Sequence, residues 1–183
     1  MKYQRYKRGQ IVLVDFTPSM GSEMRGKHFA IILTKKDSPN SGVVTVIPLS
    51  SKHKNYYLDI GNIVQKQIYP QLLNISSNLL IVLQNIDVTN TNEENIREIN
   101  ATLKNVEEFM NISNMYIEKN KRSYALVQNI TTISKMRIKK PVNKYDPLKG
   151  LIADSLILDL IDNKIKELFL NEIWQNTKYM VLY

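Results

Sequence analysis

Short apolar runs separated by turn residues make up roughly the first sixty residues of the chain. Ile11–Phe16, Phe29–Thr34 and Val43–Leu49 have the length and apolar content of β-strands, and Phe29–Thr34 is apolar enough to be buried on both faces. Gly, Pro, Ser and Asn punctuate the segments between them. Tyr56–Ile60 has the pattern of a fourth strand. Short strands at this spacing predict a small β-barrel in the front third of the chain.

Helical periodicity replaces this pattern in the middle of the chain. Thr91–Glu94 fits a capping box. Apolar residues then recur at spacings of three and four, at Ile96, Ile99, Leu103, Val106 and Met110. This pattern predicts an amphipathic helix. The helix either packs on its own domain, which is the interpretation we favour, or binds a partner or a second copy of the chain. Leu79–Gln84 fits a strand or a short buried helix, because periodicity does not separate the two at this length.

The last third of the chain mixes both patterns. Ser123–Ile133 returns to β character. Asp146–Pro147 predicts a helix start, with Asp as the N-cap and Pro at the first helical position. A broad apolar stripe follows from Ile152 to Leu168, and Trp174–Tyr183 has the composition of a last strand.

Length and composition narrow the class of protein. At 183 residues and 21.3 kDa the chain corresponds to about one domain. It has no cysteine, which excludes disulfides, thiolate zinc sites and a cysteine nucleophile. The longest apolar runs, among them Leu79–Leu83, are far shorter than the ~20 residues that span a membrane, and the N-terminus lacks the apolar core of a signal peptide. We therefore expect a cytoplasmic protein with no membrane partner.

Positive charge is concentrated in two distant segments. Residues 1–54 carry ten Lys and Arg against three Asp and Glu, and residues 121–150 carry eight against one. Residues 55–120 between them carry four against eight. Random surface charge or a face that binds a polyanion such as nucleic acid would both produce this distribution.

Few residue types are available for catalysis. His28 and His53 are the only imidazoles, and neither zinc-type spacing nor a glycine-rich phosphate loop occurs, so we expect no metal and no cofactor. Two polar clusters remain, residues 21–28 and 50–54, each at the end of a predicted strand. If those strands are neighbours, the clusters emerge beside each other and offer hydroxyls, imidazoles and positive charge around one phosphate. Otherwise they are solvated loops.

The order of several motifs resembles that of the PemK/MazF family of toxins from bacterial toxin–antitoxin modules. Lys7–Ile11 is similar to the opening Lys-Arg-Gly element, and Gly21–Glu23 to the Gly-Ser/His-Glu loop. Val44–Ser50 is similar to an apolar strand that ends in Thr, and Asn129–Ser134 to a late Gln-Ile-Arg-Thr-Ile-Asp element. The family's catalytic Arg falls on His28 here.

This resemblance implies a fold and an activity. The expected fold is α+β and mainly β: a small CcdB-like, Src-homology-3-like barrel with an inserted amphipathic helix and a C-terminal helix. Residues 1–183 would form a single domain with about 61–120 as a helical insertion. The implied activity is metal-independent endoribonuclease cleavage of single-stranded RNA, including mRNA, by a homodimer that a cognate antitoxin neutralises. The alternative is a catalytically silent barrel that binds nucleic acid or a protein.

The resemblance also implies roles for the two clusters. His28 is the candidate acid or base, because an imidazole exchanges protons near neutral pH, with a structural imidazole that bonds a backbone carbonyl as its alternative. Ser50 would hydrogen-bond a phosphate oxygen, and Arg25 would supply charge. The expected RNA-binding residues are Ser22, Glu23, Lys27, Ser51, Lys52 and His53. The Arg and Asp of the family's late element fall on Thr131 and Ser134.

Overall fold

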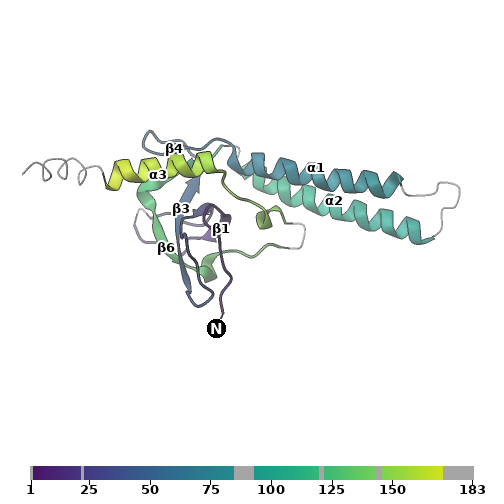
Figure 1. Cartoon of the computed structure of the whole chain (residues 1–183), viewed down its shortest axis with the longest axis horizontal. Helices are drawn as coiled ribbons and strands as arrows, with labels where there is room; N and C mark the ends of the chain where they lie inside the picture. Colours follow the sequence, from purple (N-terminus) through teal and green to yellow (C-terminus); the bar gives the residue numbers. More distant parts are fainter. Residues whose placement is uncertain (1, 22, 85–92, 120–121, 143–145, 171–183) are drawn as a thin grey trace, which may run out of the picture. The chain divides into compact units, whose positions relative to one another are not determined.

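The computed structural model describes residues 2–21, 23–84, 93–119, 122–142 and 146–170 (Figure 1). Its contacts divide the chain into two compact units. The sheet unit falls within residues 1–61, 122–139 and 152–183, and the helical unit within residues 62–121 and 140–151. Each unit is therefore assembled from segments that lie far apart in the sequence.

The sheet unit is built on one antiparallel sheet with the strand order β1-β2-β3-β5-β4, in which β6 pairs with the first half of β3. Its strands are β1 (Ile11–Asp15), β2 (Lys27–Ile32), β3 (Val43–Ser50), β4 (Leu58–Asp59), β5 (Tyr124–Ala125) and β6 (Thr131–Ser134). The four strands predicted in the first third of the chain are present, and the ends of β1 to β3 lie within two residues of those predicted. The α+β class is confirmed.

Burial on both faces explains why the middle strand is so apolar. The four residues Phe29–Ile32 of β2 are all buried, as their unbroken apolar run predicts. On one face, alternating residues of β1, β2 and β3 form a core cluster with Ile133 of β6. Its members on β1, β2 and β3 are Val12, Val14, Ala30, Ile32, Val44 and Val46.

The sheet stops short of a closed barrel. In the described residues β1 meets the chain after β6 at one isolated bridge, Val14 to Ile138, and Lys139 N–H donates to Leu13 O at 2.8 Å. A 3₁₀ turn at Lys135–Arg137 separates this bridge from β6, so a continuous ladder does not form.

The C-terminal helix of the sheet unit begins later than predicted. α3 spans Ser155–Phe169, and Asp154 caps it by accepting a hydrogen bond from Ile157 N–H at 2.9 Å. The start predicted at Asp146–Pro147 is wrong, because Asp146 caps only the short 3₁₀ turn η3 (Pro147–Lys149), which belongs to the helical unit. Both carboxylates are of the N-cap type, which sequence alone does not rank. The strand predicted at Trp174–Tyr183 lies outside the described residues.

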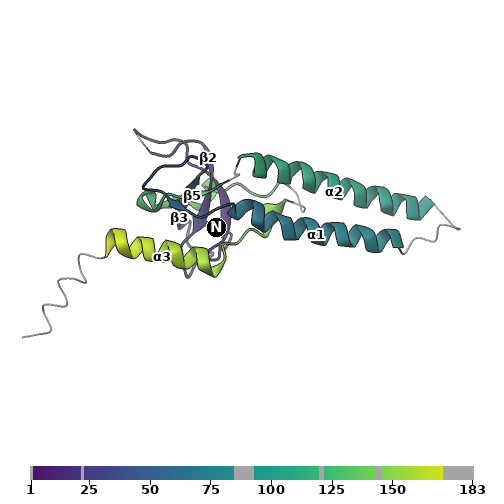
Figure 2. The ribbon, with the colours of Figure 1, turned by 90° about the horizontal axis from the view of Figure 1, so that it is seen from above.

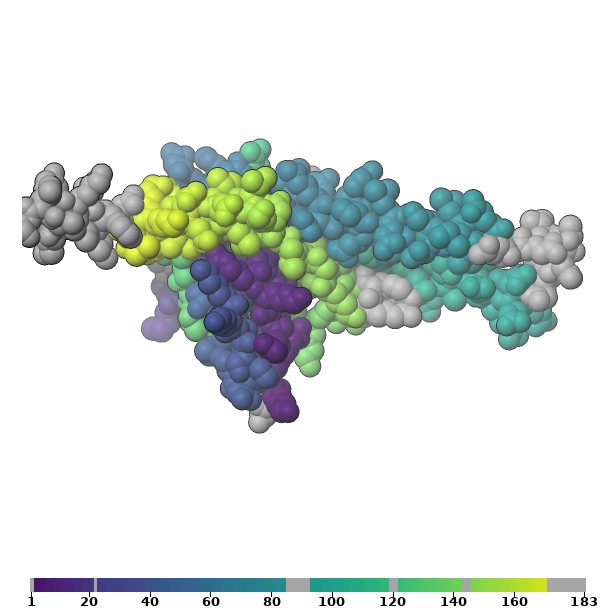
Figure 3. Space-filling view, in the orientation of Figure 1, coloured from purple at the N-terminus to yellow at the C-terminus, as the bar shows by residue number. Residues whose placement is uncertain are grey.

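The N-terminal segment of the sheet unit lies directly against α3, as the space-filling view shows (Figure 3). Gly9 O accepts from Ala153 N–H at 2.8 Å, and the Arg8 guanidinium pairs with Asp162 of α3. Gly9 has a φ of +84°, and a Cβ there would lie 3.1 Å from Leu158, so both backbone and packing require glycine.

The helical unit is an antiparallel pair, α1 (Ile63–Gln84) and α2 (Glu93–Lys119), which run side by side in both views (Figures 1 and 2). Leu79–Gln84, which the sequence left open, is the last part of α1. The predicted amphipathic helix is α2, although its buried side is shifted from the predicted stripe. Phe109, Ser113 and Tyr116 are buried, whereas Ile96 and Leu103 are each 47% exposed.

The turn η3 is held to α2 within the helical unit. The Asp146 carboxylate accepts hydrogen bonds from the Tyr116 hydroxyl at 3.0 Å and from Val142 N–H at 2.8 Å. Burial, followed by the Asp146 charge, raises the pKa of Tyr116 above its ordinary value. Among the helices that the structure describes, none is long and apolar enough to cross a membrane.

Candidate functional site

A groove with a volume of about 520 Å³ opens on the sheet unit. It brings together the β1–β2 loop, the second half of β3 and the chain from 129 to 137. The residues that line it are Phe16, Pro18, Glu23, Met24, Pro48, Asn129, Ile130, Thr131, Thr132, Ile133, Ser134 and Arg137. The lining residues thus carry hydroxyl, amide, carboxylate and guanidinium groups, and the groove has the size of a ligand-binding site.

Hydrogen bonds fix the β1–β2 loop at one wall of this groove. Phe16 N–H donates to Gly26 O at 2.9 Å, and the positive φ of Gly26, +79°, lets the chain turn back there. At the loop's tip Glu23 N–H donates to Met20 O at 3.1 Å, while the Glu23 carboxylate accepts from Met20 N–H at 3.0 Å. Met24 packs against the core cluster. Glu23 is therefore an exposed carboxylate on an anchored loop.

The base of this loop is held by a charged network at Asp15. Its carboxylate accepts from the Thr17 hydroxyl and lies 3.0 Å from Lys139 Nζ. The hydrogen bond from Thr17, and then that from Lys139, lower the pKa of Asp15 well below its usual range. Asp15 therefore stays ionised beside the groove at neutral pH.

The opposite wall is shaped by the turn that follows β6. The Ser134 hydroxyl oxygen accepts from Met136 N–H at 3.3 Å and so caps the 3₁₀ turn Lys135–Arg137. Lys135, at the start of this turn, is buried, whereas Arg137, at its end, lines the groove. Of the residues that the structure places along the groove, Arg137 is the sole cation and Glu23 the sole acid.

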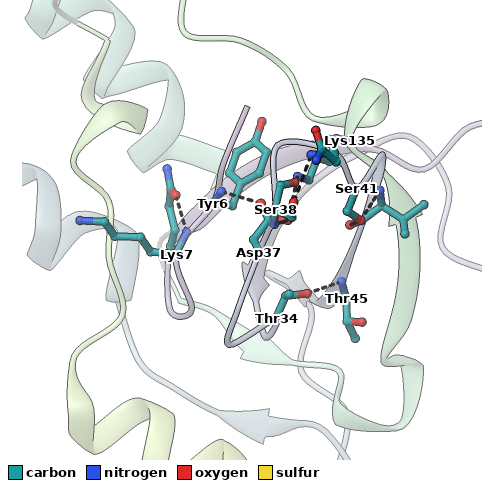
Figure 4. Close-up of polar contacts among 11 residues, drawn as sticks. Tyr6, Lys7, Thr34, Asp37, Ser38, Ser41, Thr45 and Lys135 are labelled. Carbon is teal, nitrogen blue, oxygen red and sulfur yellow. Dashed lines mark hydrogen bonds and ion pairs between the residues drawn. The ribbon is translucent and has the colours of Figure 1, made fainter. Parts of the chain in front are cut away.

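A buried ion pair anchors this turn to the β2–β3 loop (Figure 4). Lys135 Nζ lies 2.8 Å from the Asp37 carboxylate and donates to Ser38 O at 2.9 Å, and both side chains of the pair are 2% exposed. Asp37 also accepts from Tyr6 N–H at 2.8 Å. Burial raises the pKa of Asp37, but the hydrogen bonds from Lys135 and Tyr6 outweigh it, so its pKa is lowered.

The two predicted clusters do emerge at the same end of the sheet. β2 and β3 are antiparallel neighbours, in register from Ala30 opposite Pro48 to Ile32 opposite Val46. The start of β2, with Lys27 and His28, therefore lies at the same end as Ser50, the last residue of β3. Of the nine predicted site residues only Glu23 lines the groove, and Ser22 lies outside the described residues.

His28 lies behind the groove wall. Its ring centroid is 6.4 Å from that of Phe16, which lines the groove. Its Nε2 is 2.8 Å from Arg25 O, and because a carbonyl only accepts, Nε2 carries the proton. This is the hydrogen bond that a structural imidazole would make. Arg25 is exposed, and its guanidinium donates to Gly21 O at 3.3 Å.

The remaining predicted residues are exposed or make local contacts. The Ser50 hydroxyl oxygen accepts from Lys52 N–H at 3.0 Å in a tight turn, and Ser51 and Lys52 are exposed. The His53 ring meets the Tyr124 ring edge-on, with 5.3 Å between centroids. Lys27 is exposed and lies opposite Asp15 in the register of β1 and β2.

Sequence reasoning missed Arg137. The charge count included it in the basic segment 121–150 without separating it from its neighbours. The available signal was the Ser134-Lys135-Met136-Arg137 run directly after a strand, because Ser caps turns through its hydroxyl. In the part of the chain that the structure describes, no group of His, Asp and Glu gathers closely enough to hold a metal ion.

Comparison with known proteins gives a matching family model and several similar solved structures. A family model described as PemK-like, MazF-like toxin of type II toxin–antitoxin system matches residues 7–107, more than half of the chain. The crystal structure of MazF (form I) from Deinococcus radiodurans is similar to 89% of this chain and 94% of its own, with 14% identity and a TM-score of 0.45. Among curated proteins none matches.

Proposed function

The chain belongs to the PemK-like, MazF-like toxin family of type II toxin–antitoxin systems, and from this premise we propose that it is an endoribonuclease toxin. It cleaves single-stranded RNA, including mRNA, in the cytoplasm without a metal ion or cofactor. It acts as a homodimer, and a cognate antitoxin neutralises it. The observation that supports the proposal beyond the family is the groove, which is lined by Arg137 and three hydroxyl-bearing residues.

The groove residues suit the chemistry of RNA cleavage. The ribose 2′-OH attacks the adjacent phosphorus, so an O2′–P bond forms and the P–O5′ bond breaks. An acceptor must take the 2′ proton, a donor must protonate the departing 5′ oxygen, and positive charge must stabilise the crowded phosphate. In this proposal Arg137 supplies that charge, and Thr131, Thr132 and Ser134 hydrogen-bond phosphate or ribose oxygens.

Glu23 and His28 are the candidates for the two proton transfers. The Glu23 carboxylate lies on the groove wall and is able to accept the 2′ proton. His28 stays our candidate for the second transfer, and to act it has to release Arg25 O when RNA displaces the loop. Ser50 and Arg25 remain proposed phosphate contacts at the same end of the sheet, with Lys27, Ser51, Lys52 and His53 as proposed RNA-binding neighbours.

The test is cleavage of a long single-stranded RNA in excess EDTA by wild type and by three variants. We expect Arg137→Ala to lower the rate by about 10²-fold or more, as loss of a group that stabilises transition-state charge does. His28→Ala should lower it by about 10²-fold, the size of a general acid–base contribution. Arg97→Ala, which removes an exposed cation of α2, is the matched control and should cut like wild type.

The outcomes separate the roles. Equal cutting by Arg137→Ala and wild type would remove Arg137 from the mechanism, and a fully active His28→Ala would make His28 the structural imidazole. If all four proteins cut equally, the activity comes from a contaminating nuclease or from other residues of the chain.

A catalytically silent barrel that binds nucleic acid is the second candidate. The observations that favour it are the engaged Nε2 of His28 and the presence of Thr131 and Ser134 where the family has Arg and Asp. It predicts that folded wild-type protein binds RNA without cutting it, with or without EDTA.

A further inference from the structure

A second hollow, with a volume of about 640 Å³, lies on the sheet unit away from the groove. It is formed by the segment before β1 and the start of the β2–β3 loop. The residues that line it, which we call the basic hollow, are Arg5, Tyr6, Lys7, Arg8, Lys35, Lys36 and Asp37. Five of these seven are cations, and none of them is among the site residues expected from the sequence.

Backbone hydrogen bonds hold the two segments of the basic hollow together. Tyr3 N–H donates to Pro39 O at 2.8 Å, and Tyr6 N–H donates to the Asp37 carboxylate at 2.8 Å. Gly9 N–H donates to Ile32 O at 2.8 Å where the N-terminal segment meets β2. The cations are therefore brought together before any ligand arrives, which lowers the ordering cost of binding.

The one acid of the basic hollow does not neutralise these cations. The charge of Asp37 is matched by Lys135 in the buried ion pair, and its carboxylate also accepts from Tyr6 N–H and Ser38 N–H. Arg8 has a structural role, since its guanidinium donates to Leu33 O at 2.8 Å and pairs with Asp162.

Four cations are left to meet solvent. Arg5, Lys7, Lys35 and Lys36 are all exposed, and within the described residues none of them makes an ion pair. An uncompensated cluster of this kind attracts a polyanion.

We propose that the basic hollow binds the phosphodiester backbone of single-stranded RNA outside the cleaved sequence. This deepens the proposed function, because it gives the same RNA a second contact surface. Contacts made by Lys and Arg alone carry affinity but no sequence information, since every nucleotide has the same phosphate. The only aromatic ring along the described lining, Tyr6, is buried and not available for base stacking.

The distance from the groove fits one continuous strand of RNA. Arg8 of the basic hollow precedes β1, and Phe16 of the groove follows β1. These two residues therefore lie beyond opposite ends of β1. At ~3.3 Å per residue β1 spans roughly 17 Å, which a few extended nucleotides cover. Arg137 is also linked to the basic hollow through its own turn, because Lys135 of that turn pairs with Asp37. RNA that binds at Arg137 and extends past the cut therefore reaches the basic hollow within a few nucleotides.

The test compares two double variants of the full chain that lose the same charge. Lys35→Gln with Lys36→Gln removes two cations from the basic hollow, and Lys66→Gln with Lys104→Gln removes two exposed cations from the helical unit. The probe is a fluorescent 2′-O-methyl oligouridine of about twenty nucleotides, which lacks the 2′-OH that cleavage needs. Fluorescence anisotropy measures its affinity between about 50 and 200 mM salt.

We expect the variant of the basic hollow to bind the probe about tenfold more weakly at ~0.1 M salt. The slope of log affinity against log salt should decrease in magnitude by about 1.4, because each of the two lost phosphate contacts contributes about 0.7 on a single strand. The control variant should match wild type in both. Equal losses in the two variants, or no loss in either, would overturn the proposal.

Two further outcomes are distinct. The first outcome uses oligoglutamate as a competitor. If it displaces the probe from wild type, and its own affinity falls more in the basic-hollow variant than the affinity of the probe does, the ligand is an acidic peptide and the RNA proposal is overturned. Because the probe is not cleavable, selective loss of binding would support the basic hollow even if the protein cut no RNA. The proposed cleavage would then fail separately.

Discussion

At the scale of single residues, Asp37 and Lys135 form the most buried of the ion pairs that the structure describes. Asp37→Asn leaves the buried Lys135 ammonium with a carbonyl but without a counter-charge. Breaking a buried pair by removing one partner costs about 3 kcal/mol or more. We expect a loss of this size in the free energy of unfolding measured with urea. Asp59→Asn, which removes an exposed pair with Arg122, is the control and should cost much less.

The same variant has a pH signature. The pKa of Asp37 is lower in the folded chain than in the unfolded one, so its stabilising effect is complete above the ordinary Asp pKa of ~3.9. The effect is lost as pH falls through the folded pKa. The difference in unfolding free energy between wild type and Asp37→Asn should therefore shrink as pH drops from about 5 towards 2. A difference that stayed constant would mean that Asp37 is not ionised in the folded protein.

At the scale of elements, the pair α1 and α2 depends on a narrow buried side of α2. Phe109 is 1% exposed, whereas its neighbour Met110 is 37% exposed. Phe109→Ala should cost about 3 kcal/mol of unfolding free energy, because it removes a large buried ring and leaves a cavity. Met110→Ala is the matched control, and circular dichroism at the helical minimum during urea unfolding is the measurement. Comparable losses in both variants would show that Phe109 is not a packing centre.

Elements with a clear alternation or an unbroken apolar run were predictable from sequence. β1, β2 and β3 are of this kind, because burial on one or both faces leaves a direct trace in residue type. α1 was predicted only as part of the expected helical insertion, with Leu79–Gln84 left open between strand and helix. No helix was assigned to its first part, which contains Pro70 and, in Lys66, a single charged residue. The true start of α3 was missed because Asp146 and Asp154 are equivalent as caps.

The candidate site was harder to predict than the sheet. The sequence predicted that the two polar clusters lie beside each other if their strands are neighbours. The structure meets this condition, because β2 and β3 are adjacent antiparallel strands. The position of Arg137 depends on a short turn and on the pairing of Lys135 with Asp37, almost a hundred residues away. A partnership over that separation leaves no local pattern, so residue type alone did not separate the groove cation from its neighbours.

At the scale of the whole molecule, the helical hairpin is inserted where two paired strands would otherwise turn. β4 and β5 are antiparallel partners. At their ends Ser123 N–H donates to Gly61 O at 2.8 Å, and Ile60 N–H donates to Ser123 O at 3.1 Å. The points at which the chain leaves the sheet unit for α1 and returns to it after α2 are therefore already joined.

We predict that residues 62–121 can be replaced by a short Gly-Ser turn without loss of the sheet. The paired ends make the loop-closure cost of the new turn small. Dispersed amide resonances and a cooperative urea transition would show a folded sheet unit. Because Asp146 loses Tyr116, a second deletion variant also carries Asp146→Asn, which avoids an unpaired buried carboxylate. A collapsed spectrum in both deletion variants would contradict the expected insertion.

The meeting of Gly61 and Ser123 also bears on how such a chain changes over generations. Because Gly61 and Ser123 are already hydrogen-bonded to each other, a single insertion or deletion in the gene between them can add or remove the helices while the sheet unit still folds. Selection can then act on the added arm alone, altering its length or its surface for a new host or a new inhibitor. The groove and the basic hollow would meanwhile keep their inherited geometry.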